Sequence, residues 1–386
     1  MKILIALTYY QPYTSGLTIY AVRQAQAFAN LGHQVTVLTS QYDRSLPKSE
    51  ESLGVRIIRV PVVLKISKGA LMPQLPFRAW QLIGEADVVN LHVPQFDSSI
   101  LAIITKLRKK PVVMTYHCDI QMPSGLINQI AGGISGFSHR IAAGLADVIV
   151  HNTRDFAEHS DFLKDYLNKM VVIQPPVWLP KVEESDIAAF CEKFGIDAKG
   201  PVIGMVSRLA TEKGVEYLVE ALPRVLQDIP DSRVIFAGAY QNVPGESAYQ
   251  EKILTLIEKL EERWRFLGVL SDLELTSFLT LCDVLVLPSI NSTESFGMVQ
   301  IEAMSCGTPV VATDLPGVRQ PVKSTGMGRI VPPMDAPALA QAIVEVIGMK
   351  KDYNPSLIAE LETHYAPETI AEDYERLFKG LLEGNG

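Results

Sequence analysis

The sequence is poor in cysteine and has no long apolar run. Its four cysteines are scattered among 386 residues without paired spacing, so we expect neither a disulfide framework nor a zinc site. The apolar stretch at the start is soon interrupted by Tyr9-Tyr10-Gln11-Pro12, and no other run reaches the length that spans a bilayer. We therefore expect a cytoplasmic protein with reduced thiols.

Two common patterns for binding phosphate groups are also missing. No G-x-G-x-x-G follows the first predicted strand, which disfavours a dinucleotide-binding Rossmann domain. No Asp-x-Asp pair occurs anywhere in the chain, so a motif that would hold a metal-bound diphosphate is absent. We expect neither a metal nor a cofactor.

Charge is unevenly divided between the two halves of the chain. The net charge of −8 argues against general nucleic-acid binding. Residues 1–180 carry 17 Lys and Arg against 12 Asp and Glu, a balance of +5, which leaves −13 for the remainder. A basic first half suits an anionic acceptor or a peripheral contact with the inner membrane surface. A drift in surface charge without functional meaning explains the asymmetry about as well.

The length and the apolar pattern indicate two α/β domains. A chain of 386 residues with 47% apolar and 20% charged residues is too long for one ordinary globular domain. In both halves short apolar runs alternate with helical segments, which is typical of mostly parallel, doubly wound sheets. The proline-rich run 174–180 indicates an extended linker. We therefore predict domains at residues 1–178 and 179–366, followed by a helix at 367–386.

The stretch from Ser289 to Asp314 has the pattern of a phosphate-binding unit. The run Val284–Leu287 before it predicts a buried strand, and Phe296–Met304 predicts a short helix. If Ser295 or a neighbour caps this helix, its first turn presents unpaired N–H groups to a phosphate. These groups belong to Phe296, Gly297, Met298 and Val299.

Two carboxylates flank this predicted helix N-terminus. Glu294 would lie at its mouth and Glu302 about two turns in, near one face of the helix. One site would then bind a diphosphate and accept hydrogen bonds from sugar hydroxyls, which suits a nucleotide sugar. A surface helix that carries two glutamates by chance shows the same spacing, and on spacing alone the two interpretations are about equally good.

Two further candidates follow predicted strands. Arg208 and Lys213 lie on the loop after Val202–Ser207. They suit a diphosphate, because Arg offers a fork for two oxygens and Lys a mobile point charge. A solvated charged loop would look the same. His117 follows the predicted strand Val112–Thr115, and a lone histidine in that place is more often structural.

The string E-S-F-G-M-V-Q-I-E-A-M-S-C-G-T-P-V-V-A-T closely resembles the signature of the family-4 retaining glycosyltransferases, which have the GT-B fold. The segment S-R-L-x-x-x-K-G, which includes Arg208 and Lys213, resembles the second motif of that family. The resemblance covers nearly the whole chain. It implies two doubly wound, Rossmann-like domains that face each other across a cleft, with the acceptor on the first and the donor mainly on the second. The C-terminal helix would pack back on the first domain.

The resemblance also implies roles for individual residues. The predicted catalytic residues are His117, Arg208, Lys213 and Glu294. The predicted donor-binding residues are Gly16, Leu17, Arg208, Lys213, Gly238, Gly268, Val269, Leu270, Glu294, Phe296, Gly297, Met298, Val299 and Glu302. Within this set Glu302 would bind the ribose and Glu294 the hexose. In the first loop the usual Gly-Gly pair of the family is replaced by Ser15-Gly16.

The implied reaction is a metal-independent, retaining transfer of a hexose from a nucleotide diphosphate sugar, most simply UDP-glucose. The acceptor would be a saccharide or a lipid-linked chain of the kind used in exopolysaccharide or cell-envelope synthesis. Two other functions remain open. A nucleotide-sugar epimerase of the same fold would need no acceptor, and a catalytically silent nucleotide-sugar-binding partner would tolerate the altered Ser15-Gly16 loop.

A lipid-linked acceptor would require a surface that meets the membrane. The region 66–83 is unusually apolar for a connection, and the predicted helix 126–145 has one apolar stripe close in sequence to the basic run Lys106–Lys110. The stripe consists of Ile127, Ile130, Ile134, Phe137 and Ile141. A helix that faces the core is the more usual explanation of such a stripe.

Overall fold

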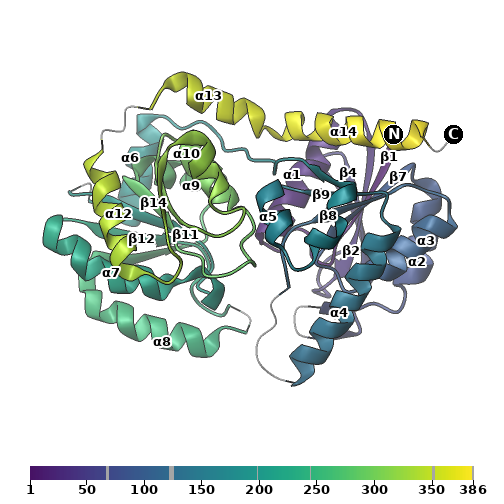
Figure 1. The fold of residues 1–386 in the computed structure, drawn as a ribbon, viewed down its shortest axis with the longest axis horizontal. Helices are drawn as coiled ribbons and strands as arrows, with labels where there is room; N and C mark the ends of the chain where they lie inside the picture. Colours follow the sequence, from purple (N-terminus) through teal and green to yellow (C-terminus); the bar gives the residue numbers. More distant parts are fainter. Residues whose placement is uncertain (67–68, 121–125, 198, 244, 350–352, 385–386) are drawn as a thin grey trace. The chain divides into compact units, whose positions relative to one another are not determined.

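The chain folds into two compact units in the computed structural model (Figure 1). The structure describes all residues except 67–68, 121–125, 198, 244, 350–352 and 385–386, and it describes no side chains for 66 and 126–131. The first unit comprises Met1–Val177 and His364–Gly386, and the second comprises Trp178–Thr363. The chain thus leaves the first unit within the proline-rich run 174–180 and returns to it at the C-terminus.

The first unit is built on an eight-stranded sheet in the order β10-β9-β8-β7-β1-β2-β4-β3. All neighbouring strands are parallel except β3, which runs antiparallel to β4 at the edge. A separate two-stranded ribbon is formed by β5 and β6. The strands are β1 (Lys2–Ala6), β2 (Gln34–Gln41), β3 (Ser49–Ser52), β4 (Val55–Pro61), β5 (Leu64–Ile66), β6 (Gly69–Leu71), β7 (Val88–Val93), β8 (Val112–Tyr116), β9 (Val148–His151) and β10 (Met170–Val172).

Helices cover both faces of this sheet. Side chains alternate between the two faces along each strand, so Ile3 and Ile5 of β1 pack in one apolar core and Leu4 and Ala6 in the other. The core with Ile3 includes α1 (Gly16–Asn30) and α14 (Pro367–Glu383), and the opposite core includes α2 (Leu75–Glu85), α3 (Ser98–Leu107) and α4 (Leu126–Leu145). The C-terminal helix α14 therefore lies beside α1 (Figure 1). Shorter elements are α5 (Arg154–His159) and the 3-10 segment Leu163–Lys169.

The second unit has a fully parallel six-stranded sheet in the order β13-β12-β11-β14-β15-β16. Its strands are β11 (Val202–Val206), β12 (Arg233–Ala237), β13 (Trp264–Gly268), β14 (Val284–Leu287), β15 (Val310–Thr313) and β16 (Gly328–Val331). Its helices are α6 (Glu184–Phe194), α7 (Val215–Asp228), α8 (Ser247–Ile257), α9 (Asp272–Leu281), α10 (Met298–Ser305), α11 (Gln320–Thr325), α12 (Ala336–Gly348) and α13 (Pro355–His364), with 3-10 turns at Thr211–Lys213 and Glu258–Arg263. The prediction of two doubly wound α/β domains is confirmed.

One predicted helix boundary is wrong. The helix expected at Phe296–Met304 begins only at Met298, and its N-cap is Gly297 rather than Ser295. Gly297 has a φ of 78°, a left-handed conformation that favours glycine and turns the chain sharply into the helix. Glu302 is consequently the fifth residue of α10, little more than one turn from its start, instead of two turns in.

No helix in the described part of the chain is both long and apolar enough to cross a membrane. The described part of the apolar stripe predicted on the helix 126–145 is not packed in the core as its more usual explanation requires. Ile134 and Phe137 are 49% and 67% exposed and Ile141 is half-buried, whereas the buried ones among the described side chains of α4 are Ser138, His139, Ala142 and Ala143. Ile127 and Ile130 lie outside the described side chains.

Candidate functional site

Two loops at the carboxyl edge of the second sheet bring the predicted charged residues together. Arg208 and Lys213 follow β11, and Glu294 follows β14. The two strands are parallel neighbours, so the loops after them start side by side. Lys213 Nζ donates to Glu294 Oε2 over 2.5 Å, and both side chains are largely buried. The resemblance predicts that these two residues bind different parts of the donor, and the structure shows them bonded to each other.

The loop after β11 is held in place by its backbone. It forms a 3-10 turn at Thr211–Lys213 that ends at Gly214, whose φ is 62°. A Cβ atom at Gly214 would lie 2.2 Å from the carbonyl oxygen of Pro288, so this position has no room for another residue. The N–H of Ile290 donates to the carbonyl oxygen of Glu212 and ties this loop to the one after β14.

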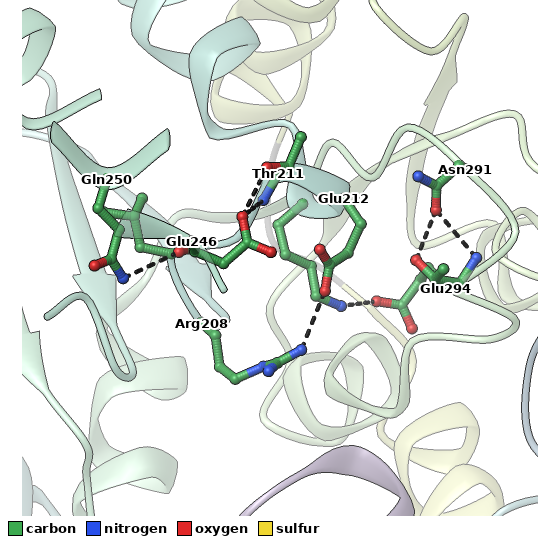
Figure 2. Close-up of polar contacts among 10 residues, drawn as sticks. Arg208, Thr211, Glu212, Glu246, Gln250, Asn291 and Glu294 are labelled. Atoms are coloured by element: carbon green, nitrogen blue, oxygen red, sulfur yellow. Dashed lines mark hydrogen bonds and ion pairs between the residues drawn. The ribbon is translucent and has the colours of Figure 1, made fainter. Parts of the chain in front are cut away.

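Arg208 is also paired in this arrangement. Its Nη2 donates to Glu212 Oε1 over 3.1 Å (Figure 2), with about a third of the Arg208 side chain exposed. On the other side of the loop, Glu246 Oε2 accepts bonds from the N–H and the hydroxyl of Thr211, at 3.0 and 2.7 Å (Figure 2). Both predicted diphosphate-binding cations are therefore paired with carboxylates.

The loop that carries Glu294 is ordered by its own turn. Asn291 Oδ1 accepts from the N–H and the hydroxyl of Thr293, at 3.1 and 2.6 Å (Figure 2). The N–H of Glu294 donates to the carbonyl oxygen of Asn291. A side chain that bonds the backbone two residues on is the usual device of an Asx turn, and here it fixes where the Glu294 carboxylate starts.

The α10 N-terminus differs in detail from the prediction. Because the helix begins at Met298, the N–H groups of its first turn belong to Met298, Val299 and Gln300. The N–H of Gln300 donates to the carbonyl oxygen of Gly297, which leaves Met298 and Val299 as the groups able to meet an anion. Phe296 precedes the helix and is wrong as a first-turn donor. Glu302 is buried, with 7% of the residue exposed.

Two glycines predicted to bind the donor lie at the ends of β12 and β13. The N–H of Gly238 donates to the carbonyl oxygen of Gly268 over 2.6 Å. A Cβ atom on Gly238 would lie 2.0 Å from the carbonyl oxygen of Ser207, so this glycine is required for the close approach of two strand ends. Beyond β13, Val269 is exposed and Leu270 is half-buried.

The remaining predicted residues belong to the first unit. Ser15 is the N-cap of α1, and its hydroxyl accepts from the N–H of Thr18, so the residue that replaces a glycine of the family pattern has a capping role. Gly16 and Leu17 form the first turn of this helix. His117 follows β8, and its Nε2 lies 2.9 Å from Nδ1 of His92. No metal-binding group of three or more His, Cys, Asp or Glu side chains occurs among the described residues.

Comparison with known proteins decides the family. Residues 15–175 match the model of the glycosyl transferase 4-like domain, and residues 186–355 match that of glycosyl transferases group 1. The chain belongs to the family-4 glycosyltransferases of the GT-B fold. The transferase is 27% identical over 336 residues to the phosphatidyl-myo-inositol mannosyltransferase of Mycobacterium leprae, a match that covers 86% of this chain and 83% of the relative.

Other relatives span the transferase more completely. The 2-deoxystreptamine N-acetyl-D-glucosaminyltransferase of Streptomyces fradiae is 26% identical and covers 96% of the chain and 93% of the relative. Among solved structures, HepE of Anabaena in complex with UDP and glucose superimposes with a TM-score of 0.77 at 21% identity, over 98% of this chain and 99% of that one. These structural matches establish the GT-B fold.

Several residues that shape the site of the transferase were not predicted from the sequence. Glu212, Thr211 and Glu246 were not predicted as site residues, although Glu212 directly precedes Lys213 in the sequence. A carboxylate four positions after an arginine is a detectable signal of an ion pair. Thr211 and Glu246 carried no comparable signal, because their bond joins residues 35 positions apart.

Proposed function

We propose that this transferase moves glucose from UDP-glucose to a saccharide or lipid-linked acceptor, with retention of anomeric configuration and without a metal ion. The observation that carries the proposal is the cluster of Arg208, Lys213 and Glu294 at the carboxyl ends of β11 and β14. Parallel sheets bind ligands at this edge. The Anabaena structure contains UDP and glucose, which supports the choice of donor.

The cluster suits a leaving nucleoside diphosphate. Negative charge develops on the diphosphate as its bond to the sugar breaks, and donors already in place stabilise it at no further cost of reorganisation. Lys213 and the N–H groups of Met298 and Val299 are such donors, and Arg208 becomes one when its partly exposed bond to Glu212 gives way. These cations supply the positive charge that a metal ion held by an Asp-x-Asp motif would supply, so the proposed reaction needs no metal ion.

Glu294 has two tasks in this scheme. One of its carboxylate oxygens holds Lys213 Nζ, which fixes the direction of the ammonium group. The second oxygen accepts hydrogen bonds from hydroxyls of the hexose. Because Glu294 is engaged in an ion pair, we assign it no role as a covalent nucleophile. The acceptor oxygen then attacks C1 on the face the diphosphate leaves, its proton passes to the departing phosphate oxygen, and the configuration is retained.

A calorimetric titration in EDTA tests the donor. Purified protein is titrated with UDP-glucose, UDP-galactose, UDP-N-acetylglucosamine, GDP-mannose and ADP-glucose. We expect UDP-glucose to bind most tightly. In a transfer reaction with an acceptor, NMR should show that the anomeric proton of the transferred glucose keeps the α configuration of the donor. Tightest binding of a different donor would overturn the assignment of glucose. Conversion of the donor sugar in the absence of any acceptor would favour an epimerase.

An exposed surface of the first unit supports a lipid-linked acceptor. Helix α3 packs against both α2 and α4, and all three expose apolar side chains: Phe77, Trp80, Ile103, Leu107, Ile134 and Phe137. Cations lie among them, and the Arg108 guanidinium sits 5.0 Å above the Trp80 ring. Apolar side chains that enter the lipid boundary beside basic groups that meet anionic headgroups are the features of an interfacial surface.

Vesicle flotation tests this surface. The intact protein should float with vesicles that contain an anionic phospholipid and stay in solution with neutral ones. The double variant Phe77→Ser/Phe137→Ser should lose most of this binding, because it removes two of the most exposed apolar side chains of the surface. Leu273→Ser, which changes an exposed apolar residue of the second unit, is the matched control. Absence of binding to anionic vesicles would remove the membrane contact.

A further inference from the structure

The start of α8 holds the charged loop that follows β11 in the second unit. Glu246 Oε2 accepts from both the N–H and the hydroxyl of Thr211, at 3.0 and 2.7 Å (Figure 2). Gln250 Nε2 donates to the carbonyl oxygen of Leu209 over 3.4 Å. Glu246 and Gln250 are four positions apart, which places them on one face of the helix. The proposed reaction so far gives Glu246 no task.

The carboxylate of Glu246 does not serve its own helix. Glu246 is the N-cap residue of α8, and its side chain makes no capping hydrogen bond. A side-chain oxygen at this position can accept from N–H groups of the first helical turn. Here the carboxylate is bonded instead to Thr211, which lies 35 positions away in the sequence. The contact therefore stabilises the loop after β11 and not the start of α8.

Thr211 begins the short 3-10 turn that ends at Lys213. The N-cap of this turn is Ala210, whose side chain has no atom that could accept from the N–H groups of the turn. Glu246 supplies the missing acceptor from outside the loop, because the N–H of Thr211 is the first one of the turn. Lys213 stands two residues further on, and its Nζ reaches Glu294 Oε2. A shift of Thr211 would therefore move the backbone from which Lys213 projects.

Two effects of the Glu246 carboxylate on a bound diphosphate have opposite signs. Like charges repel, so the negative charge by itself weakens the binding of an anion to the neighbouring loop. The two hydrogen bonds act in the other direction, because they order the turn before the ligand arrives and so reduce the entropy lost on binding. Removal of the side chain therefore tightens the binding of UDP if repulsion dominates and weakens it if the hydrogen bonds do.

We propose that Glu246 is a positioning residue that fixes the turn at Thr211, so that Lys213 is already in place to bind the diphosphate of the donor. This inference rests on the proposed function, in which Lys213 binds that diphosphate. Glu246 itself touches no substrate in this scheme. Gln250 supports the same loop at Leu209. The affinity for UDP then depends on Glu246, whereas the affinity for uridine, which has no diphosphate, does not.

Binding measurements test this role, with calorimetry for UDP and saturation-transfer NMR for uridine. Glu246→Ala removes both hydrogen bonds and should weaken UDP by about tenfold, the value of one hydrogen bond to a charged group. The affinity for uridine should stay unchanged. Glu246→Gln keeps an oxygen that accepts from Thr211 and should restore most of the affinity for UDP. Glu251→Ala, which removes an exposed carboxylate from the same helix, is the matched control and should bind UDP as the wild type does.

The same change in a Lys213→Ala background separates this role from a general effect on the loop. A residue that acts through Lys213 loses its effect when Lys213 is gone, so Glu246→Ala should then weaken UDP by less than about twofold. A tenfold loss that persists in this background, or tighter binding of UDP by Glu246→Ala alone, would overturn the positioning role and leave the proposed function standing. Thr211→Val removes only the hydroxyl bond and repeats the comparison if Glu246→Ala does not fold, with an expected loss of about threefold. Wild-type affinity for UDP in Lys213→Ala would instead refute the proposed contact with the diphosphate and the positioning role with it.

Discussion

The two units of this transferase equip the carboxyl edges of their sheets with opposite chemistry. All seven histidines lie in the first unit, where neutral groups hydrogen-bond one another from the fully buried Gln24 and His92 to the partly buried His117. The second unit contains no histidine, and its predicted site consists of the ion pairs Lys213–Glu294 and Arg208–Glu212. A network of neutral hydrogen-bonded side chains fixes the direction of a hydrogen bond to a hydroxyl. The cation of an ion pair can instead exchange its carboxylate partner for a phosphate.

The largest expected consequence of this difference is a different response to acid. Burial holds the pKa of His92 at about 3 and those of His139 and His151 at about 4, below the ordinary value of 6.5. Between pH 6.5 and 4 the unfolded chain therefore binds protons that the folded first unit excludes, and stability falls as the pH is lowered. Each of these histidines contributes roughly 2 kcal/mol of this loss between pH 7 and 5.

Two carboxyl groups sharpen this prediction. The pKa of Asp97 in the first unit is raised by burial to about 6, so its effect has the opposite sign and offsets about one histidine. In the second unit the pKa of Glu274 is held at about 2 by Lys193 and the Ser271 cap, a contribution that is lost only below pH 4.5. Hydrogen exchange at pH 7 and 5, corrected for intrinsic rates, should show loss of protection in β7 and β8 and little in β11 and β12. Equal loss in both units would contradict the comparison.

Removing the charge of Lys213 should give the largest effect on catalysis. Loss of one donor to a developing anion typically costs about 10²–10³ in rate, so Lys213→Ala should lower kcat by that factor. Steady-state transfer from UDP-glucose measures it. Full activity in this variant would show that Lys213 does not meet the diphosphate.

A double variant removes the main ambiguity of that result. Lys213→Ala also leaves the largely buried Glu294 carboxylate without its partner, and an uncompensated charge of this kind is itself destabilising. Glu294→Gln in the same background relieves that charge. If the loss reflects the missing contact with the diphosphate, the double variant stays at least as slow as Lys213→Ala, because Gln at position 294 restores no cation and itself weakens binding of the hexose. Recovery of activity would assign the loss to the unpaired carboxylate.

Glu302 and Glu294 should separate the nucleotide from the sugar. A hydrogen bond to a charged group contributes roughly 1.5–3 kcal/mol, so Glu302→Gln should weaken UDP by about tenfold to a hundredfold. Glu294→Gln retains an acceptor for Lys213 and should weaken UDP-glucose much more than UDP. Calorimetry with both ligands on both variants checks this. Equal weakening of UDP by the two changes would undo the assignment.

The sequence predicted the fold well because apolar runs locate buried strands. The runs at Val112–Thr115 and Val284–Leu287 became β8 and β14 within one residue at each end. The strand β3, Ser49–Ser52, was missed because its sequence SEES has no apolar residue, and only pairing with β4 at the sheet edge makes it a strand. The helix start at Met298 was misplaced because the left-handed turn at Gly297 is a backbone property that composition does not display.

The site was predicted one residue at a time and not as a set of partners. Lys213 and Glu294 are 81 positions apart. They meet because β11 lies between β12, the next strand in the chain, and the distant strand β14. Sequence patterns do not give that strand order. The same holds for Gln24 and His92, which come from a helix and a strand 68 positions apart.

The smallest expected effect tests whether the ion pairs of the second unit give way to a ligand. Glu212 competes with a diphosphate for Arg208, and a partly exposed ion pair of this kind contributes roughly 0.2–1 kcal/mol, so Glu212→Gln should tighten UDP binding by up to about fivefold. The backbone bond from Ile290 to residue 212 does not involve the side chain and should keep the loop in place. Glu220→Gln, on the exposed side of α7, removes one negative charge as the control. Weaker binding of UDP by Glu212→Gln would mean that Glu212 orients Arg208 for the phosphate. The second unit would then hold its binding side chain with a fixed partner, as the first unit does.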